Sequence, residues 1–410
     1  MLNLTHWEIG PIFRALMRNK TGAILIAIQI AVTMTIIVNA IFIISERQKL
    51  MARDSGVDEA NSFYLSSSSF GEDFNTEVTA AEDLAMIRQT PGVIDAMQIN
   101  AIPMSGGGWS MSLQTKAGDD IDGTGAAVYM VDEHFLKTLD VDVIAGEPFT
   151  LTDIRLRKGS STDWPDKTII TKSMAETLYP DEPWHSVVGK TVYINNNEPM
   201  IITGIIDQLQ APWIGWDGVE RVMLSPERLE FTSYRYFIRT EVGKRDELMP
   251  QIEEMLANSN KKRLIRDVRS MQETRERSYR QHSAMITILG TVMIVLTVVT
   301  GLGIVGLASF SVNRRKKQIG TRRALGASQQ AILRYFMLEN FIISSAGVVL
   351  GAVLTVGLNI WLVKAFELNT LDWYLVPAGM VSLWIVGQLA VFGPAKRAAA
   401  IPPALATRTV

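Results

Sequence analysis

Four apolar runs without a single Asp, Glu, Lys or Arg place the strongest constraint on how this chain can fold. A helix of about 20 apolar residues is long enough to cross the hydrocarbon layer of a membrane. Because each run meets this length, we predict transmembrane helices at residues 21–44, 284–311, 341–363 and 373–394. The first run is longer than the apolar core of a secretory signal and no small-x-small cleavage site follows it, so we expect it to remain as an anchor.

Composition argues against several other classes of protein. Of the 410 residues, 47% are hydrophobic and 20% are charged, which suits a membrane protein better than an ordinary soluble enzyme. The net charge of -2 offers no general attraction to nucleic acid. The absence of cysteine excludes disulfides, thiolate metal sites and a cysteine nucleophile.

Lysine and arginine flank the apolar runs unevenly. They gather before the first run, between the second and the third, and after the fourth, whereas the link between the third and fourth carries only Lys364. Lys and Arg near the ends of membrane spans favour the cytoplasmic side. We therefore predict three cytoplasmic segments, 1–20, 312–336 and 395–410, and an outer segment at 45–283. A basic run at 261–280 points the other way, but long translocated domains largely escape this rule.

The outer segment is large enough for one or two cores, and its patterns predict both helices and strands. "TAAEDLAMIRQTPG" has Thr79 and Glu82 at capping-box spacing, which predicts a helix that starts there. Further helices are expected from Ser173 and over "RDELMPQIEEMLAN", with Pro250 in the first turn of the latter. "WSMSLQT" and "AAVYMV" predict paired strands, and "TVYINNNEPMIITGIID" predicts a hairpin that turns at 195–197. The fold class is a membrane α-helical protein, with one span before and three spans after a large α+β extracytoplasmic domain.

Two glycine patterns lie inside the apolar runs. "GLGIVG" matches a dinucleotide-binding motif, but it sits within a hydrophobic run rather than between a strand and a helix, so we favour close helix packing. A G-x-x-x-G pattern in the third run predicts a packing face, because small residues let helix backbones approach. The predicted packing residues are Gly301, Gly303, Gly306, Gly347 and Gly351.

The sequence contains no pattern that indicates a catalytic, metal or cofactor site. The four histidines are scattered, and there is neither a G-x-S-x-G elbow nor a P-loop, so any nucleotide energy must come from a partner. "GDDIDGTG" resembles part of a calcium loop but lacks the terminal Glu of an EF-hand, and we favour a hairpin turn. Polar residues within the runs can mark a pathway or bond between helices, and the lack of ionisable neighbours favours the second interpretation. They are Gln29, Thr33, Thr35, Asn39 and Gln388.

The stretch "NRRKKQIGTRRALGASQQAILRYF" joins the second and third runs. Positive-inside anchoring explains its basic residues, but it does not require the Leu-Gly-Ala-Ser pattern. "KKQIGTRRALGASQQAILRYFMLEN" and the closing "GPAKRAAAIPPALATR" resemble the MacB/FtsX-type permease family of ABC transporters, the type VII or mechanotransmission group. "VDEHFLKTLDVDVIAGEPFT" and "TIITKSMAETLYPDEPWHSVVGKTVYINNNEPMIITGIIDQL" resemble the periplasmic core domain of that family, so the resemblance covers nearly the whole chain.

The resemblance implies that the loop at 312–336 contains a coupling helix that seats on a separate ATPase subunit. The family commonly has Glu where this chain has Gln318, which weakens any claim of an ionic contact at that position. The residues expected at the contact are Gln318, Ile319, Gly320, Arg322, Arg323, Ala324, Leu325, Gly326 and Ala327. From the amphipathic pattern itself, Ile319, Ala324 and Leu325 are expected to face a groove in the partner.

The resemblance also divides the rest of the chain. A βαβ-rich part is expected at about 61–102 and 236–269, with a strand-rich insertion at about 103–235. Stalk helices are expected near 45–53 and 265–282. Residues 1–20 are predicted to form an amphipathic helix at the inner interface, or else to extend the first transmembrane helix.

These features lead to a functional hypothesis. The chain is expected to be a non-enzymatic permease in the bacterial inner membrane that drives export or extraction of a substrate from the periplasmic side. The implied partners are two ATPase copies with their ATP and Mg²⁺, a second permease chain identical or paralogous to this one, and membrane lipids. A periplasmic adaptor and an outer-membrane channel are further partners in the family. The alternatives are a signalling or scaffold protein that regulates a periplasmic partner such as a cell-wall hydrolase, and a ligand sensor that uses no ATPase.

Overall fold

The computed structural model describes residue 16 and residues 20–70, 74–158, 161–366 and 370–403. It divides into two compact units, a helical unit of Met1–Met51 with His282–Val410 and an α+β unit of Ala52–Gln281. The predicted amphipathic helix at 1–20 lies outside the described residues except for its positions 16 and 20. Each unit is described by itself.

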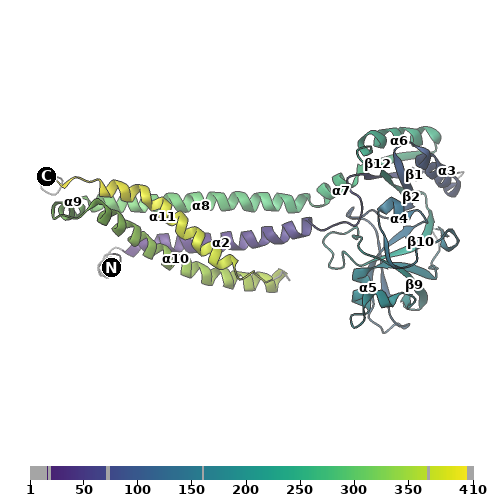
Figure 1. The fold of residues 1–410 in the computed structure, drawn as a ribbon, viewed down its shortest axis with the longest axis horizontal. Coiled ribbons are helices and arrows are strands. Elements are labelled where there is room, and N and C mark those ends of the chain that lie inside the picture. Colours follow the sequence, from purple (N-terminus) through teal and green to yellow (C-terminus); the bar gives the residue numbers. More distant parts are fainter. Residues whose placement is uncertain (1–15, 17–19, 71–73, 159–160, 367–369, 404–410) are drawn as a thin grey trace. The chain divides into compact units, whose positions relative to one another are not determined.

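Among the described residues, the helical unit contains long apolar helices and one short polar helix (Figure 1). The long ones are α2 (Lys20–Met51), α8 (Arg280–Arg314), α10 (Gln329–Phe366) and α11 (Leu375–Ala399). All of them are long and apolar enough to cross a membrane, which confirms the prediction from the apolar runs. The short helix α9 (Lys316–Ala324) lies in the chain between α8 and α10.

Small residues bring α10 against α2. A Cβ atom at Gly347 would lie 2.7 Å from the carbonyl oxygen of Ala27, and one at Gly351 would lie 2.9 Å from the Cβ of Met34. Neutral hydrogen bonds add to this packing. Thr33 and Thr300 share one at 2.8 Å, and the amide of Gln29 donates to the carbonyl of Val299 at 3.2 Å. The predicted hydrogen bonding between helices is therefore confirmed for these polar residues.

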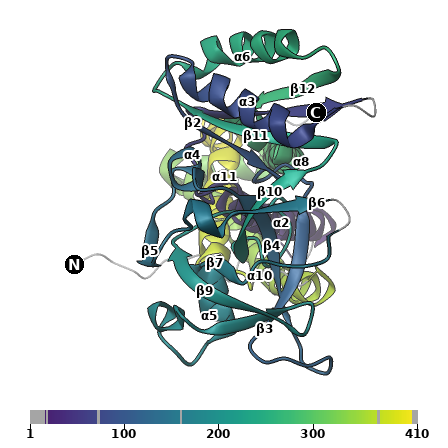
Figure 2. The same ribbon diagram turned by 90° about the vertical axis from the view of Figure 1, so that its right-hand side faces the viewer.

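The α+β unit contains an antiparallel four-stranded sheet in the order β12-β1-β11-β2. Its helices α3 (Thr76–Gln89) and α6 (Arg245–Ser259) cover one face, as Figure 2 shows, and bury Phe63, Leu65, Leu84 and Ile252 between them and the sheet. The strands are β1 (Ser62–Ser69), β2 (Val93–Ile99), β11 (Ser233–Thr240) and β12 (Arg263–Ser270). The short helices of this unit are α4 (Phe135–Leu139), α5 (Lys172–Leu178) and α7 (Met271–Ser278).

A larger sheet in the same unit follows the order β4-β3-β8-β9-β7-β10-β6, and β4 also pairs with β10, so most of the path closes on itself. The side chains of α5 pack into its core with Ile170, Ile202 and Met223. Its strands are β3 (Trp109–Gln114), β4 (Thr124–Val131), β5 (Val143–Gly146), β6 (Arg155–Lys158), β7 (Lys167–Thr171), β8 (Thr191–Ile194), β9 (Glu198–Ile206) and β10 (Val222–Glu230).

The two predicted strand pairs are present. β3 pairs with β4, and β8 pairs with β9, both antiparallel. Asn195 and Asn196 adopt positive φ angles of 47° and 67° in the second turn. Asn tolerates this left-handed conformation better than most residues, so the Asn run is a sound hairpin signal.

Two predicted helix starts are wrong, and a third is shifted by a single residue. The helix predicted from Thr79 begins one turn earlier, because the side chain of Asn75 caps α3 by accepting from the backbone N–H of Val78. The helix predicted from Ser173 begins one residue earlier and is capped by Thr171. The stalk helix predicted from residue 265 is displaced by β12, which pairs with β1, and helix begins only at Met271 after its cap Ser270.

Candidate coupling site

The candidate site is α9 with the turn that follows it. Arg315, at the junction of α8 and α9, directs its guanidinium at α10, where it lies 3.0 Å from a carboxylate oxygen of Glu339. The Glu339 side chain is 9% exposed. A buried carboxylate without a cation would be costly, so this pair fixes the start of α9 against α10.

Ile319 anchors the middle of α9. It is 5% exposed and belongs to an apolar cluster with Val312 of α8, Phe336 of α10 and Ala395 of α11, whose ends lie together in Figure 1. Gly320 is buried as well. The expectation that Ile319 faces a partner protein is therefore wrong, because its side chain packs within this chain. Gly320 is likewise buried within this chain, so the expectation that it contacts the partner is also wrong.

The Leu-Gly-Ala-Ser sequence forms the turn that ends α9 and begins α10. Leu325 ends α9, and Gly326 follows with a φ of +99°, a conformation that disfavours any side chain. The backbone N–H of Gly326 donates to the carbonyl of Arg323 at 3.2 Å, and that of Ala327 donates to Arg322 at 3.0 Å. These two bonds make a Schellman motif. The hydroxyl of Ser328 then accepts from the N–H of Ala331 and caps α10.

The turn exposes an apolar tip within a basic surface. Leu325 is 84% exposed, and Gln318, Arg322, Ala324 and Gly326 are exposed beside it. Arg323 and Ala327 are partly exposed, so seven of the nine expected contact residues reach the surface. The guanidinium of Arg322 lies 5.0 Å from the ring centre of Tyr335, which holds it over α10. An exposed Leu on a hydrogen-bonded turn, with Arg322 and Arg323 just before it in the chain, suits an apolar pocket with an acidic rim.

The predicted packing glycines separate into two groups. Gly347 and Gly351 contact α2, and a Cβ atom at Gly303 would meet the amide of Gln29 at 2.7 Å. A Cβ atom at Gly301 or Gly306 would meet nothing within 4 Å in the part of the chain that the structure describes. These two glycines therefore make no close helix contact among the described residues, and helix packing at Gly301 and Gly306 stays a prediction.

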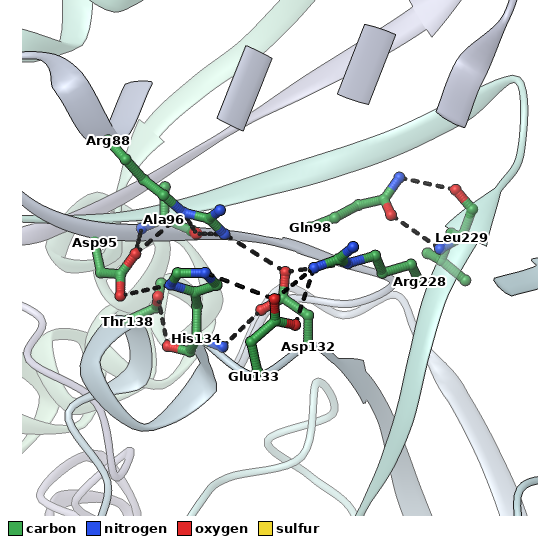
Figure 3. A network of polar contacts seen from close by, with 10 residues as sticks. All are labelled: Arg88, Asp95, Ala96, Gln98, Asp132, Glu133, His134, Thr138, Arg228 and Leu229. Atoms are coloured by element: carbon green, nitrogen blue, oxygen red, sulfur yellow. Dashed lines mark hydrogen bonds and ion pairs between the residues drawn. The ribbon is translucent and has the colours of Figure 1, made fainter. Parts of the chain in front are cut away.

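A polar network in the α+β unit joins its two sheets (Figure 3). Nδ1 of His134 lies 2.9 Å from a carboxylate oxygen of Asp95 on β2, and Arg228 of β10 lies 2.7 Å from Glu133. The carboxylate of Asp132 lies between Arg88 and Arg228, at 3.6 and 3.8 Å. Burial raises the pKa of Asp132, and the backbone N–H of His134 and the charge of Arg88 oppose that rise.

This network has a structural role. The side chain of Gln98 on β2 donates to the carbonyl of Leu229 on β10 and accepts from its N–H, both at 2.9 Å, so it completes the bridge between the sheets. No cluster of three His, Asp or Glu side chains suited to a metal ion occurs among the described residues.

Sequence reasoning missed Glu339. It is the only acidic residue between 329 and 366, and it stands two positions before the third apolar run. An isolated carboxylate at the end of a span calls for a cationic partner, and the basic loop offers several. That signal was available, but the choice of Arg315 depends on how α8, α9 and α10 pack.

The long apolar helices with an α+β unit between the first and second of them define a multi-spanning membrane protein with a large domain outside its spans. Residues 21–258 match the model of the MacB-like periplasmic core domain, and residues 290–403 match that of the FtsX-like permease C-terminal region. The chain belongs to the MacB/FtsX-type family of ABC transporter permeases.

Individual relatives are distant. The chain is 26% identical over 240 residues to the macrolide export ATP-binding/permease protein MacB of Campylobacter jejuni subsp. jejuni serotype O:23/36 (strain 81-176), a match that covers 56% of this chain but 36% of that protein. It is 24% identical over 310 residues to the uncharacterized ABC transporter permease YknZ of Bacillus subtilis (strain 168), covering 73% of this chain and 74% of that one. The crystal structure of the extracellular domain of YknZ from Gram-positive bacteria aligns at 15% identity with a TM-score of 0.32, covering 50% of this chain and all of that one.

Proposed function

We propose that this chain is the permease subunit of an ABC transporter in the bacterial inner membrane, with cytoplasmic termini and the α+β unit in the periplasm. It couples ATP hydrolysis by a separate ATPase, present in two copies, to a conformational change of the α+β unit. That change drives export or extraction of a substrate from the periplasmic side. The catalytic ATP and Mg²⁺ belong to the ATPase, and a second permease chain completes the transporter.

The exposed position of Leu325 on a rigid turn is the observation that carries the proposal. Burial of an exposed Leu side chain by a partner stabilises the complex, by roughly 1.5–3 kcal/mol when burial is complete. Ile319 connects α9 to three helices, and Arg315 connects it to α10. A force on the tip would therefore act on the helical unit as a whole, without any flexible linker in α9 to absorb it.

Leu325→Asp tests the ATPase contact. The chain would be purified together with its candidate ATPase, and both complex recovery and stimulated ATP hydrolysis would be measured. We expect recovery to fall about tenfold or more, because a buried unpaired carboxylate costs several kcal/mol. Val242→Asp is the matched control, since Val242 is 87% exposed but belongs to the α+β unit. Full recovery and undiminished hydrolysis with Leu325→Asp would refute the proposed seat.

The orientation has its own test. The chain has no cysteine, so Thr321→Cys creates a single labelling site on the exposed side of α9. We expect a membrane-impermeant maleimide to label this variant only after the inner membrane is opened. Labelling in intact spheroplasts would place α9 outside and would contradict the proposal.

A further inference from the structure

A pocket of about 430 Å³ lies in the α+β unit, against the face of the four-stranded sheet that α3 and α6 leave free. This volume falls in the usual range for small-molecule sites. β1, β12, α7 and two loops, 104–106 and 212–215, supply its walls. No part of the coupling site or of the network between the sheets lines it.

The sheet and α7 place cations and hydroxyl groups on one wall of the pocket. Tyr64 of β1 pairs directly with Arg269 of β12, so their side chains share one face of the sheet, opposite to Phe63 and Leu65. Helix α7 adds Arg277 and Ser278, which also line the pocket. These groups come from segments about 200 residues apart in the chain, which only the fold brings together.

The wall has donor groups that lack partners. Tyr64 is 4% exposed and lines the pocket, yet its hydroxyl makes no hydrogen bond with any residue that the structure describes. The hydroxyl oxygen is not among the fully buried polar atoms, so it opens into the pocket, where it is free to donate to a bound acceptor. The guanidinium of Arg277 forms no ion pair within the described ranges, while Arg269 has Asp267 at 3.0 Å. No carboxylate lines the pocket.

The facing wall is apolar and held in place. Trp213, Ile214 and Met104 provide its surface. The two loops are joined by hydrogen bonds from the N–H of Gly106 to the carbonyl of Pro212 at 2.8 Å and from Met104 to Ala211 at 3.2 Å. Met104 has a φ of +64°, which is unfavourable for a side chain of this size, and the hydroxyl of Ser278 donates to its carbonyl. Strain maintained in this way is typical of a preorganised binding wall.

We propose that this pocket binds an anionic amphiphile. A phosphate or carboxylate group accepts hydrogen bonds from Arg269, Arg277 and Tyr64, and the adjoining apolar part of the ligand covers Trp213 and its neighbours. A lipid headgroup and a free organic anion both offer this chemistry. Ligand binding at this site requires neither the ATPase nor transport, so it can be tested independently of the proposed function.

Binding to the purified full-length chain in a non-ionic amphipol, which does not itself carry the anionic groups of the proposed ligand, tests this inference by calorimetry. The probes are dihexanoylphosphatidylglycerol, octyl phosphate, dihexanoylphosphatidylcholine and inorganic phosphate. We expect at least one of the two anionic amphiphiles to bind about tenfold or more tightly than both phosphatidylcholine and inorganic phosphate, since charge-assisted hydrogen bonds and apolar contact are both required. Whichever of the two binds more tightly identifies a lipid or a free organic anion as the source.

The variants localise the site. Arg277→Gln, at an exposed position, is expected to weaken binding of the preferred amphiphile about tenfold, and Tyr64→Phe by a smaller factor. Arg266→Gln is the matched control, because Arg266 is an exposed cation of β12 that does not line the pocket. Thermal melting checks that each variant is folded. Equal binding of all four probes, inorganic phosphate binding as tightly as the amphiphiles, or unchanged binding in folded Arg277→Gln would overturn the proposal.

Discussion

The helical unit and the α+β unit solve the burial of polar groups in different ways. In the apolar middle of the described helices, contacts depend on missing side chains, as at Gly347 and Gly351, and on neutral hydrogen bonds such as that between Thr33 and Thr300. The ion pair of Arg315 with Glu339 lies outside that middle, beside the basic turn. The α+β unit instead buries whole ion pairs, such as Arg263 with Asp83, whose side chains are 0% and 1% exposed. The comparison predicts that a larger side chain at a helix contact destabilises the helical unit. Removal of one charge from a buried ion pair destabilises the α+β unit.

Arg263→Met should cause the largest loss of stability, and this loss should fall on the α+β unit. Among the described residues, it leaves buried Asp83 with the hydroxyl of Tyr236, at 2.6 Å, as its one remaining side-chain donor. Loss of one partner from a buried ion pair costs about 3–5 kcal/mol. Urea-dependent pulse proteolysis of the full chain, with cleavage followed in residues 52–281, measures the change. The double variant Arg263→Met with Asp83→Leu should recover much of the loss, and failure to recover would mean that packing rather than charge dominates here.

Gly347→Leu should come next. The new side chain must displace the backbone of α2 at Ala27, and overpacking of this kind costs about 1–3 kcal/mol or more. Thermal aggregation of the detergent-solubilised chain measures the result. Gly301→Leu is the control, because that position has open space within this chain. Equal damage from both substitutions would contradict the comparison and would indicate that another chain covers this side of α8.

Gly326→Ala should have a smaller and local effect. A Cβ atom at a φ of +99° strains the Schellman turn by about 1–2 kcal/mol. Hydrogen exchange at the amides of residues 326 and 327 should be faster in the variant than in the wild type. Exchange in α10, which follows the turn, should stay unchanged. Unchanged protection of both amides would show that the turn tolerates the side chain.

Asp153→Asn should have the smallest effect, and one that depends on pH. The hydrogen bond from Lys167, with others from Thr150, lowers the pKa of Asp153 to about 2 from an ordinary value of 3.8. A depressed pKa contributes stability above the ordinary value, and this contribution is lost as the pH falls toward 2. The urea midpoints of wild type and variant should therefore differ at pH 6 and approach each other as the pH falls from about 4 toward 2. A constant difference would exclude the ionised carboxylate as its cause.

The sequence was informative where a single local property decides the structure. Apolar length predicted the membrane helices, and the Asn run at 195–197 predicted a hairpin because left-handed backbone favours Asn. The orientation of Ile319 could not be obtained in this way, since an apolar side chain on a short helix can face either a partner or its own chain. Its direction depends on where Val312 and Phe336 lie.

Segments with competing preferences were the other source of error. The family resemblance placed a stalk helix from residue 265, yet pairing of residues 263–270 with β1 makes this segment a strand. The pocket of Tyr64, Arg269 and Trp213 was not predictable at all, because no local pattern unites positions so far apart. Long-range pairing decides both cases, and a single sequence does not reveal it.

The length of α9 carries a consequence of its own. Ile319 points inward and Leu325 outward on the same short helix, so the angle between them is set by the residues that separate them. Removing or inserting one residue would turn one relative to the other by about 100° around the helix axis. Substitutions between Ile319 and Leu325 leave this angle unchanged, so these intervening positions should tolerate changes of side chain far better than changes of length.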